Sequence, residues 1–225
     1  MLFCAVQLVC FCFGVTMISL LQKAGFTAFK SPDGFGAVLF GTLSFQGATW
    51  VLIYFFLRLH QLCWRDVFGL RKSRWLRTVL LVLLTVFVTL PIALWLKHVS
   101  WLVLEKTGCQ PEEQIAVTLL TGAQSWWTRV YVGAFAVVIA PVAEEFIFRG
   151  VLYPFVKQLG YPRFAWMGVN FLFALIHLDA TTLVPLFVLA LALTWLYERT
   201  DNLLAPITAH SLFNVANLIV LCFVK

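Results

Sequence analysis

Charged side chains are scarce in this chain, and their scarcity excludes a soluble globular domain. Asp, Glu, Lys and Arg make up 12% of the 225 residues, whereas soluble domains carry about 25%. Hydrophobic residues account for 62% of the chain. A surface with so few charges is suited to lipid rather than to water, so we interpret the chain as an integral membrane protein.

Alternation of polar and apolar residues is also lacking. Strands of a membrane barrel alternate in this way over about 10 residues, whereas a helical crossing needs about 20 consecutive apolar residues. Apolar stretches of the helical kind lie near residues 1–21, 36–57, 78–96, 129–148, 164–178, 182–197 and 203–224. The sequence therefore predicts an all-α, polytopic transmembrane bundle of about seven helices. Because no repeat, low-complexity tract or Pro/Gly-rich linker divides residues 1–225, we expect a single transmembrane domain.

The chain has neither a CxxC pair nor the marks of a signal peptide. The first apolar stretch, MLFCAVQLVCFCFGVTMISLL, has no basic segment before it and no small-residue cleavage site, so we expect a membrane helix. The six cysteines have no disulfide-framework or zinc-ribbon spacing. We interpret them as small apolar side chains; they are Cys4, Cys10, Cys12, Cys63, Cys109 and Cys222.

Positive charge is concentrated in one connection. The chain has 16 Lys and Arg against 10 Asp and Glu, and a basic connection lies on the cytoplasmic side of a membrane. With seven crossings, the N-terminus is then inside and the C-terminus outside, and we expect a prokaryotic cytoplasmic membrane. The cluster fits topology and contact with anionic headgroups rather than nucleic-acid binding; it comprises Arg58, Arg65, Arg71, Lys72, Arg74 and Arg77.

Two adjacent glutamates end the apolar run VYVGAFAVVIAPVAEE, although ionisable groups at membrane depth are costly. Glu145 and Arg149 are four residues apart, so on a helix they share a face and can pair. Glu144 is rotated by about 100 degrees from its neighbour, and its own i+4 residue is Phe148. The spacing therefore predicts one paired glutamate and one glutamate left free to act as a general base. A charged pair that only anchors the helix end is the alternative.

Two later apolar segments also carry polar groups at helical spacing. His177 follows Phe173 by one turn in FALIH, and His210 precedes Asn214 by one turn in HSLFN. Asn217 continues the second face. Each group alone is compatible with a packed histidine or an interhelical hydrogen bond. Taken together, they supply a general base, two imidazoles and an amide donor on three helices.

These three segments resemble a known family. EEFIFR matches an EExxxR motif, FALIH an FxxxH motif and HSLFN an HxxxN motif of the CPBP family. This family comprises intramembrane glutamic proteases, including CAAX prenyl proteases and bacteriocin-processing or immunity proteins. The resemblance covers roughly residues 129–217 as a catalytic core, and residues 1–128 add only N-terminal crossings and loops.

The resemblance implies a division of roles among these residues. Glu144 with His177 would activate a water, and His210 with Asn214 would form an oxyanion hole. Glu145 and its arginine would be the supporting pair. The implied activity is an intramembrane endopeptidase that needs no metal cofactor. Its implied partners are the lipid bilayer and a membrane-associated or lipidated protein or peptide, with no nucleic acid.

Three other functions remain open from the residues themselves. A glutamate with two histidines could bind zinc in a metalloprotease, although the chain has no HExxH motif. The same groups could relay protons in a transport protein. A membrane scaffold or immunity protein could keep the fold without catalysis. The sequence does not identify the substrate or its cleavage site.

Overall fold

The computed structural model describes residues 2–26, 35–67, 69, 75–108, 117, 120, 122 and 126–223, and the regular secondary structure of these residues is all helical. Arg71, Lys72, Arg74 and Cys109 lie outside the described residues. Three of the described helices are long and apolar enough to cross a membrane, namely Trp75–Lys106, Trp126–Gln158 and Leu183–Thr200. The prediction of an all-helical integral membrane protein is confirmed.

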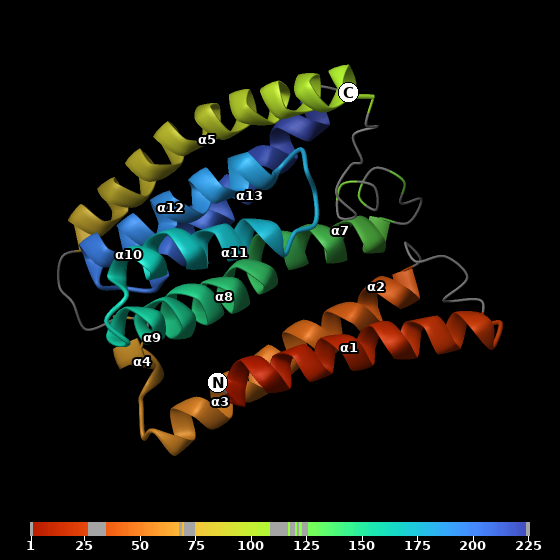
Figure 1. Cartoon of the computed structure of the whole chain (residues 1–225), viewed down its shortest axis with the longest axis horizontal. Helices are drawn as coiled ribbons and strands as arrows, with labels where there is room; N and C mark the ends of the chain where they lie inside the picture. The colour runs from red at the N-terminus through yellow and green to blue at the C-terminus, as the bar shows by residue number, and fades with distance from the viewer. Residues whose placement is uncertain are drawn as a thin grey trace. The chain divides into compact units, whose positions relative to one another are not determined.

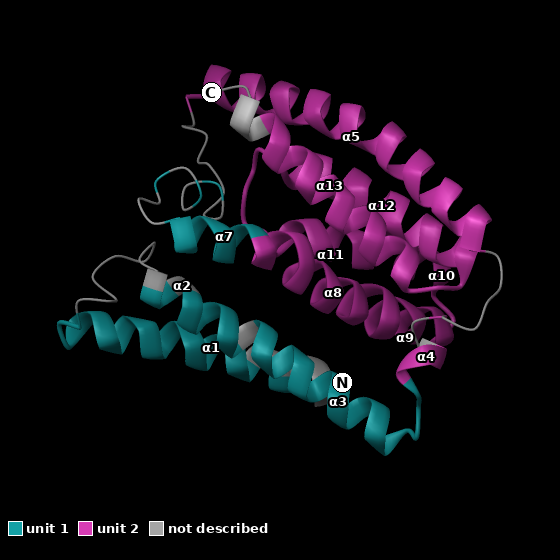
Figure 2. Cartoon of the chain, turned by 180° about the vertical axis from the view of Figure 1, so that it is seen from behind, with its two compact units in different colours: residues 1–63, 115–133 teal, residues 64–114, 134–225 magenta. Residues whose placement is uncertain are grey.

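The chain divides into two compact units (Figure 2). Residues 1–63 and 115–133 form the first. Here α1 (Leu2–Lys23) packs along a helical run made of α2 (Phe35–Thr42), the π-helical η2 (Leu43–Gly47) and α3 (Ala48–Leu59). The backbones approach closely at Gly14, where an added Cβ would lie 2.8 Å from the Cβ of Ser44. Most of α7 (Trp126–Ala134) also belongs to this unit.

The second unit comprises residues 64–114 and 134–225 and carries the predicted site. It begins with α4 (Trp64–Val67) and α5 (Trp75–Lys106). A helical run follows, made of η3 (Phe135–Ile139), α8 (Ala140–Glu145), η4 (Phe146–Leu152) and α9 (Tyr153–Gln158). The remaining helices are α10 (Pro162–Phe164), η5 (Ala165–Val169), α11 (Asn170–Leu175), α12 (Leu183–Thr200) and α13 (Leu204–Phe223), of which η5, like η3 and η4, is π-helical.

Helix α12 is the centre of the second unit (Figure 1). It contacts α5 and α13 on one side and α11 on another. Its fully buried residues Leu189, Leu193 and Leu196 form one core cluster with residues of α5 and α13. A second cluster joins η4, η5 and α11 to Ala190. Because α13 also contacts η3 and α8, the helices that carry the predicted polar residues are held side by side.

Helix α5 is longer than the apolar stretch 78–96 that predicted it. It continues past Lys97 and through VSWLVLEK to Lys106, ten residues beyond the end of that stretch. Lysine side chains near a membrane surface extend their charged ends toward water, so a single lysine does not end a helix. Pro91 lies inside α5, as prolines do in membrane helices when neighbouring groups satisfy the backbone.

Truncation of Leu193 is expected to destabilise the second unit. Leu193→Ala should lower the free energy of unfolding by about 2 kcal/mol, because a cavity forms in a packed core. Thermal unfolding of the purified protein in detergent measures this change. Leu80→Ala is the matched control, because Leu80 is 58% exposed on α5 whereas Leu193 is fully buried. Equal losses for the two variants would contradict this assignment of the core.

Candidate active site

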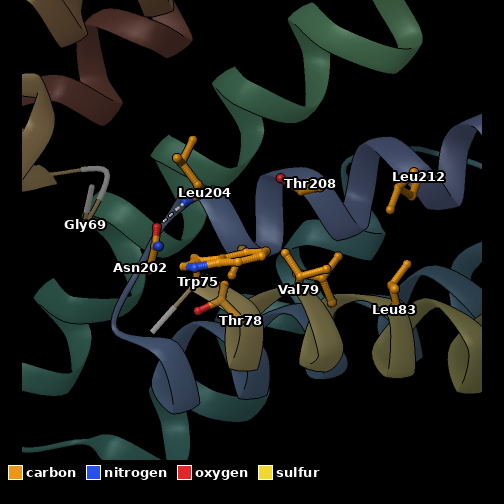
Figure 3. Close-up of a pocket in the computed structure, with 11 residues that line it drawn as sticks. Gly69, Trp75, Thr78, Val79, Leu83, Asn202, Leu204, Thr208 and Leu212 are labelled. Atoms are coloured by element: carbon orange, nitrogen blue, oxygen red, sulfur yellow. Dashed lines mark hydrogen bonds between the residues drawn. The ribbon is translucent and has the colours of Figure 1, made fainter. Parts of the chain in front are cut away.

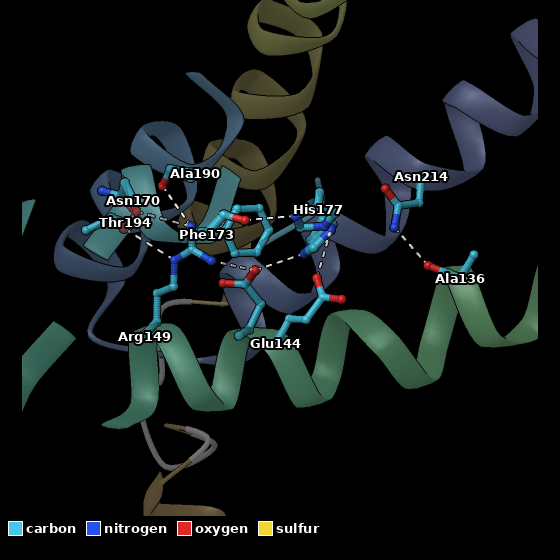
Figure 4. A network of polar contacts seen from close by, with 11 residues as sticks. Ala136, Glu144, Arg149, Asn170, Phe173, His177, Ala190, Thr194 and Asn214 are labelled. Atoms are coloured by element: carbon cyan, nitrogen blue, oxygen red, sulfur yellow. Dashed lines mark hydrogen bonds and ion pairs between the residues drawn. The ribbon is translucent and has the colours of Figure 1, made fainter. Parts of the chain in front are cut away.

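Three parts of the second unit bring the predicted polar residues into one region (Figure 4). Glu144 and Glu145 end α8, and His177 lies two residues beyond the end of α11. His210 lies in the second turn of α13, with Asn214 one turn later. All of these positions fall in segments that the sequence predicted as membrane crossings.

The two glutamates have different surroundings. The side chain of Glu145 is fully buried, and its Oε1 pairs with Nη1 of Arg149 at 2.9 Å. The side chain of Glu144 keeps 17% of its surface exposed. The ion pair has the spacing of four residues from which the sequence predicted it. Glu144 is therefore the carboxylate of the two that a water or a substrate can reach.

Arg149 is a fully buried cation, and its hydrogen bonds extend to two further helices. Its Nη2 donates to the backbone carbonyl of Ala190 at 2.9 Å and to Oδ1 of Asn170 at 3.4 Å. Its Nε donates to Oγ1 of Thr194 at 3.3 Å. The guanidinium carbon lies 4.8 Å from the ring centroid of Phe173, a cation–π distance. These contacts offset the large cost of removing a charge from water.

Sequence reasoning missed Asn170 and Thr194. Both are fully buried, and Thr194 donates its hydroxyl proton to Oδ1 of Asn170 at 2.7 Å. The amide of Asn170 in turn donates to the carbonyl of Trp166 at 2.6 Å. The available signal was an asparagine in the apolar segment WMGVNFLFALI and a threonine in VLALALTWLY. Polar residues inside apolar crossings are expected to have partners on other helices.

His210 lies between the two glutamates. Its Nδ1 is 2.9 Å from Oε1 of Glu145, and its Nε2 is 3.9 Å from Oε2 of Glu144. A carboxylate oxygen that also accepts from an arginine is an acceptor for the histidine, so Nδ1 carries a proton and donates it to Glu145. The distance to Glu144 is longer than a hydrogen bond and leaves room for relay through a bridging group. The sequence did not predict that His210 contacts Glu145.

The backbone fixes the ring of His177. Its Nδ1 lies 2.8 Å from the carbonyl oxygen of Phe173, near the C-terminal end of α11. A carbonyl only accepts, so Nδ1 donates and the neutral ring has its lone pair on Nε2. The next residue, Leu178, has a left-handed backbone with φ of 51 degrees, and it ends the helical turn. His177 therefore has a defined tautomer with a basic nitrogen at the far side of its ring.

The ring of Phe173 packs against His177, His210 and Arg149. Its ring centroid is 5.0 Å from that of His177 and 5.8 Å from that of His210. It is fully buried and also meets Phe148 edge to face at 5.1 Å. A fully buried ring at this position limits how far the imidazoles and the guanidinium can turn. Phe173 is thus a packing residue of the site.

Asn214 contacts the helix that carries the glutamates. Its Nδ2 donates to the carbonyl oxygen of Ala136 at 2.8 Å. In the π-helical η3, the amide of Ala140 bonds to the carbonyl of Phe135, five residues earlier. The corresponding partner of Ala136 would be residue 141, which is a proline without an N–H. The carbonyl of Ala136 therefore receives no hydrogen bond from residue 141 and accepts one from Asn214 instead. The side-chain amide of Asn214 retains a second N–H. Asn217 is half-buried further along α13.

A second group of polar side chains lies at the end of α12 and is smaller than the network around Arg149. No group of three or more His, Cys, Asp or Glu side chains among them is arranged to hold a metal ion. Lys157 pairs with Glu198, which also accepts from Tyr153 at 2.7 Å, and this group is partly exposed at the end of α12. The buried polar network around Arg149 is the more extensive of the two.

Comparison with known proteins agrees with the location of this network. Residues 125–216 match the family model described as "Type II CAAX prenyl endopeptidase Rce1-like". The chain is also 28% identical over 79 residues to the UPF0177 protein YxdF of Lactococcus lactis subsp. lactis (strain IL1403). That match covers 35% of this chain and 43% of the relative, so the chain spans less than half of the relative's length. No solved structure matches the chain.

Removal of the buried cation is expected to be costly. Arg149→Met should lower the free energy of unfolding by about 3 to 5 kcal/mol, because it removes the cation that is paired with the fully buried carboxylate of Glu145. Thermal unfolding in detergent measures the loss, and adding Glu145→Gln should restore part of it. Lys157→Met is the matched control, since a partly exposed ion pair contributes about 1 kcal/mol or less. Similar losses for Arg149→Met and Lys157→Met would refute the assigned difference.

Proposed function

We propose, from the premise that residues 125–216 are a domain of the Rce1-like type II CAAX prenyl endopeptidase family, that this protein is an intramembrane endopeptidase. Its substrate is a membrane-associated or lipidated protein or peptide, and a water activated by glutamate and histidine cleaves the peptide bond. The observation that carries this proposal is the difference between the glutamates. Glu145 is enclosed by Arg149 and His210, whereas Glu144 is partly exposed beside them.

The first chemical step is attack of water on the scissile carbonyl carbon. Glu144 accepts a proton from this water as the new C–O bond forms, and Nε2 of His177 is a second acceptor. The hydrogen bond from Nδ1 of His177 to Phe173 supports this role, because it leaves Nε2 with the lone pair. Glu145 is less suited to it, since its Oε1 already accepts from two side chains.

The second step stabilises the tetrahedral intermediate and breaks the C–N bond. As the doubly protonated ring, His210 donates from Nε2 to the oxyanion while Nδ1 remains bonded to Glu145. Asn214 donates with the N–H that Ala136 does not use. Preorganised donors of this kind contribute about 100 to 1,000-fold each. The proton taken from water then passes to the leaving amine, which restores Glu144.

The supporting residues act through others rather than on the substrate. Arg149 and Glu145 hold the ring of His210, and Asn170 with Thr194 holds Arg149. In this proposal the whole chain is one membrane domain of about seven crossings, with its catalytic core over residues 129–217. The basic connection then faces the cytoplasm of a prokaryotic cell, the N-terminus is inside and the C-terminus is outside.

Proteolysis by the purified, reconstituted protein tests the reaction. A panel of membrane-tethered peptides should be cleaved by the wild type and by Glu198→Gln, whose carboxylate lies outside the cluster. Glu144→Gln should lower turnover by about 100 to 10,000-fold, because the base that deprotonates water is lost. Cleavage should survive a strong zinc chelator. Activity that is lost with the chelator and restored by zinc would instead establish a metalloprotease, and full activity of Glu144→Gln would reject the proposal.

Substitution of His177 separates catalysis from folding. In His177→Asn, the side-chain amide can still donate to the carbonyl of Phe173, but the basic Nε2 is absent. We expect kcat to fall by about 100-fold or more, with the unfolding temperature close to that of the wild type. His98→Asn on the exposed face of α5 should change neither quantity. A loss of stability without a loss of kcat would show that His177 is structural.

A further inference from the structure

Helix α11 ends at membrane depth, before a connection that is not helical. The helical run formed by α10, η5 and α11 covers residues 162–175, a length of about 21 Å at 1.5 Å per residue. The hydrocarbon core of a bilayer is about 30 Å thick. Arg163 at the start of this run is exposed, as charged side chains are at a membrane surface. The run therefore stops before the opposite surface, and residues 176–182, here called the α11–α12 connection, begin inside the membrane.

Helix α12 follows this connection and crosses in the opposite direction. It packs along α11 and is about 27 Å long. Near its end, Glu198 pairs with Lys157 of α9, and α9 contacts the start of the preceding run. Irregular backbone at membrane depth occurs only where protein or water satisfies its N–H and C=O groups. The hydrogen bonds of the α11–α12 connection therefore indicate what it can bind.

Both ends of the connection are fixed by hydrogen bonds. At its start, the backbone N–H groups of His177 and Leu178 donate to carbonyl oxygens of α11 at 3.3 and 3.1 Å. Toward its end, Oδ1 of Asp179 accepts from the backbone N–H and the hydroxyl of Thr181 at 2.8 and 2.6 Å. Thr181 is only 5% exposed, so this end is anchored in the packed interior.

The middle of the connection has backbone groups without partners. Among the described residues, no group accepts a hydrogen bond from the backbone N–H of Asp179 or of Ala180. The carbonyl oxygens of His177, Leu178 and Ala180 likewise accept none from this part of the chain. Leu178 is 88% exposed, and Ala180 is exposed as well. The ends of the connection are thus held in place while its middle is open to a ligand.

This combination of groups is complementary to a peptide backbone. Within four residues the connection offers both N–H donors and C=O acceptors, and a peptide offers the same two groups in each residue. The ester groups of a lipid only accept hydrogen bonds, so they cannot pair with the open carbonyl oxygens. A second peptide segment can satisfy both kinds of group.

A substrate that is cleaved inside the membrane needs partners of this kind. In a helix, its peptide N–H and C=O groups are bonded to one another. Unwinding the helix opens the scissile carbonyl to attack, but it leaves backbone groups without partners in hydrocarbon, which is costly. A site that cleaves such a peptide must offer new partners beside its reacting groups. The open backbone groups begin at His177, the second proton acceptor in the proposed reaction.

We propose that residues 178–180 are a docking segment, beside which the substrate binds as an extended peptide. The carbonyl oxygen of Leu178 and the N–H of Ala180 flank Asp179, so one substrate residue pairs with both, as in a parallel ladder. Peptides that add a strand to a sheet edge bind through main-chain hydrogen bonds in the same way. The substrate class is a membrane-embedded or lipidated peptide that unwinds next to its scissile bond. This assignment rests on the proposed function, because it concerns the substrate of that reaction.

An ester scan of the substrate tests the docking segment with the wild-type protein. In a membrane-tethered peptide that the protein cleaves, each backbone N–H near the scissile bond is replaced in turn by an ester oxygen. One position should raise KM about fivefold, the effect of one hydrogen bond, and leave kcat unchanged. If no ester raises KM by more than about twofold, the docking segment is overturned while the hydrolysis stands. Failure to cleave any peptide would overturn the proposed function and the docking segment with it.

Variants of the connection show whether the sensitive position pairs with this segment. Asp179→Ala removes both bonds to Thr181, so the segment is no longer held in place. We expect KM to rise about fivefold and the ester at the sensitive position to add less than about twofold. Asp179→Asn keeps the acceptor Oδ1 and should restore both values. An ester effect of the same size in the wild type and in Asp179→Ala would refute docking at this segment.

Asn202→Ala is the matched control. In the turn between α12 and α13, the Asn202 side-chain oxygen accepts from the backbone N–H of Leu204 at 2.9 Å (Figure 3). This bond has the same spacing of two residues as the bond from Thr181 to Asp179. Thermal unfolding shows that both alanine variants fold, and Asn202→Ala should leave KM and the ester effect unchanged. An equal rise in KM for Asn202→Ala and Asp179→Ala would contradict the proposal.

Discussion

The burial of one guanidinium group is the constraint on which the second unit depends. A charge in a low-dielectric interior is tolerated only when opposite charge and hydrogen-bond acceptors surround it. Arg149 has a carboxylate from its own helix, an amide oxygen from α11, and a hydroxyl and a backbone carbonyl from α12. Because these acceptors lie on three helices, the helices cannot shift relative to one another without exposing the charge. The apolar contacts around α12 act together with this network.

The same network gives the two adjacent glutamates separate roles. Consecutive residues on a helix point about 100 degrees apart, so one guanidinium can form a close ion pair with only one of the two glutamates. Glu145 is turned inward, and its Oε1 accepts hydrogen bonds from both Arg149 and Nδ1 of His210. Glu144 is left at the partly exposed side of that ring. A local rule of helix geometry thus produces one structural carboxylate and one accessible carboxylate.

Contacts within one helix could be predicted from the sequence, and contacts between helices could not. The pairing of Glu145 with Arg149 follows from a spacing of four, and the apolar stretches predicted the helical segments. The roles of Asn170 and Thr194 depend on how α11 and α12 pack, which no local pattern records. The bond from Asn214 to Ala136 needs both a π-helical turn and Pro141. The far end of α5 was not predicted, because the helix continues past Lys97 after its apolar stretch has ended.

The π-helical segments also set the phase of the helix that bears the glutamates. A π turn contains about one residue more than an α turn, so η4 acts as a one-residue insertion. It changes the direction in which the side chains after it point around the helix axis. Deleting one of the two residues between Arg149 and Leu152 would return the helix to ordinary spacing and rotate Tyr153 and the residues after it by about 100 degrees. Glu144 would keep its place, while Tyr153 would lose its bond to Glu198. In relatives, a one-residue gap at this point would therefore mark a change in helix type rather than a shortened loop.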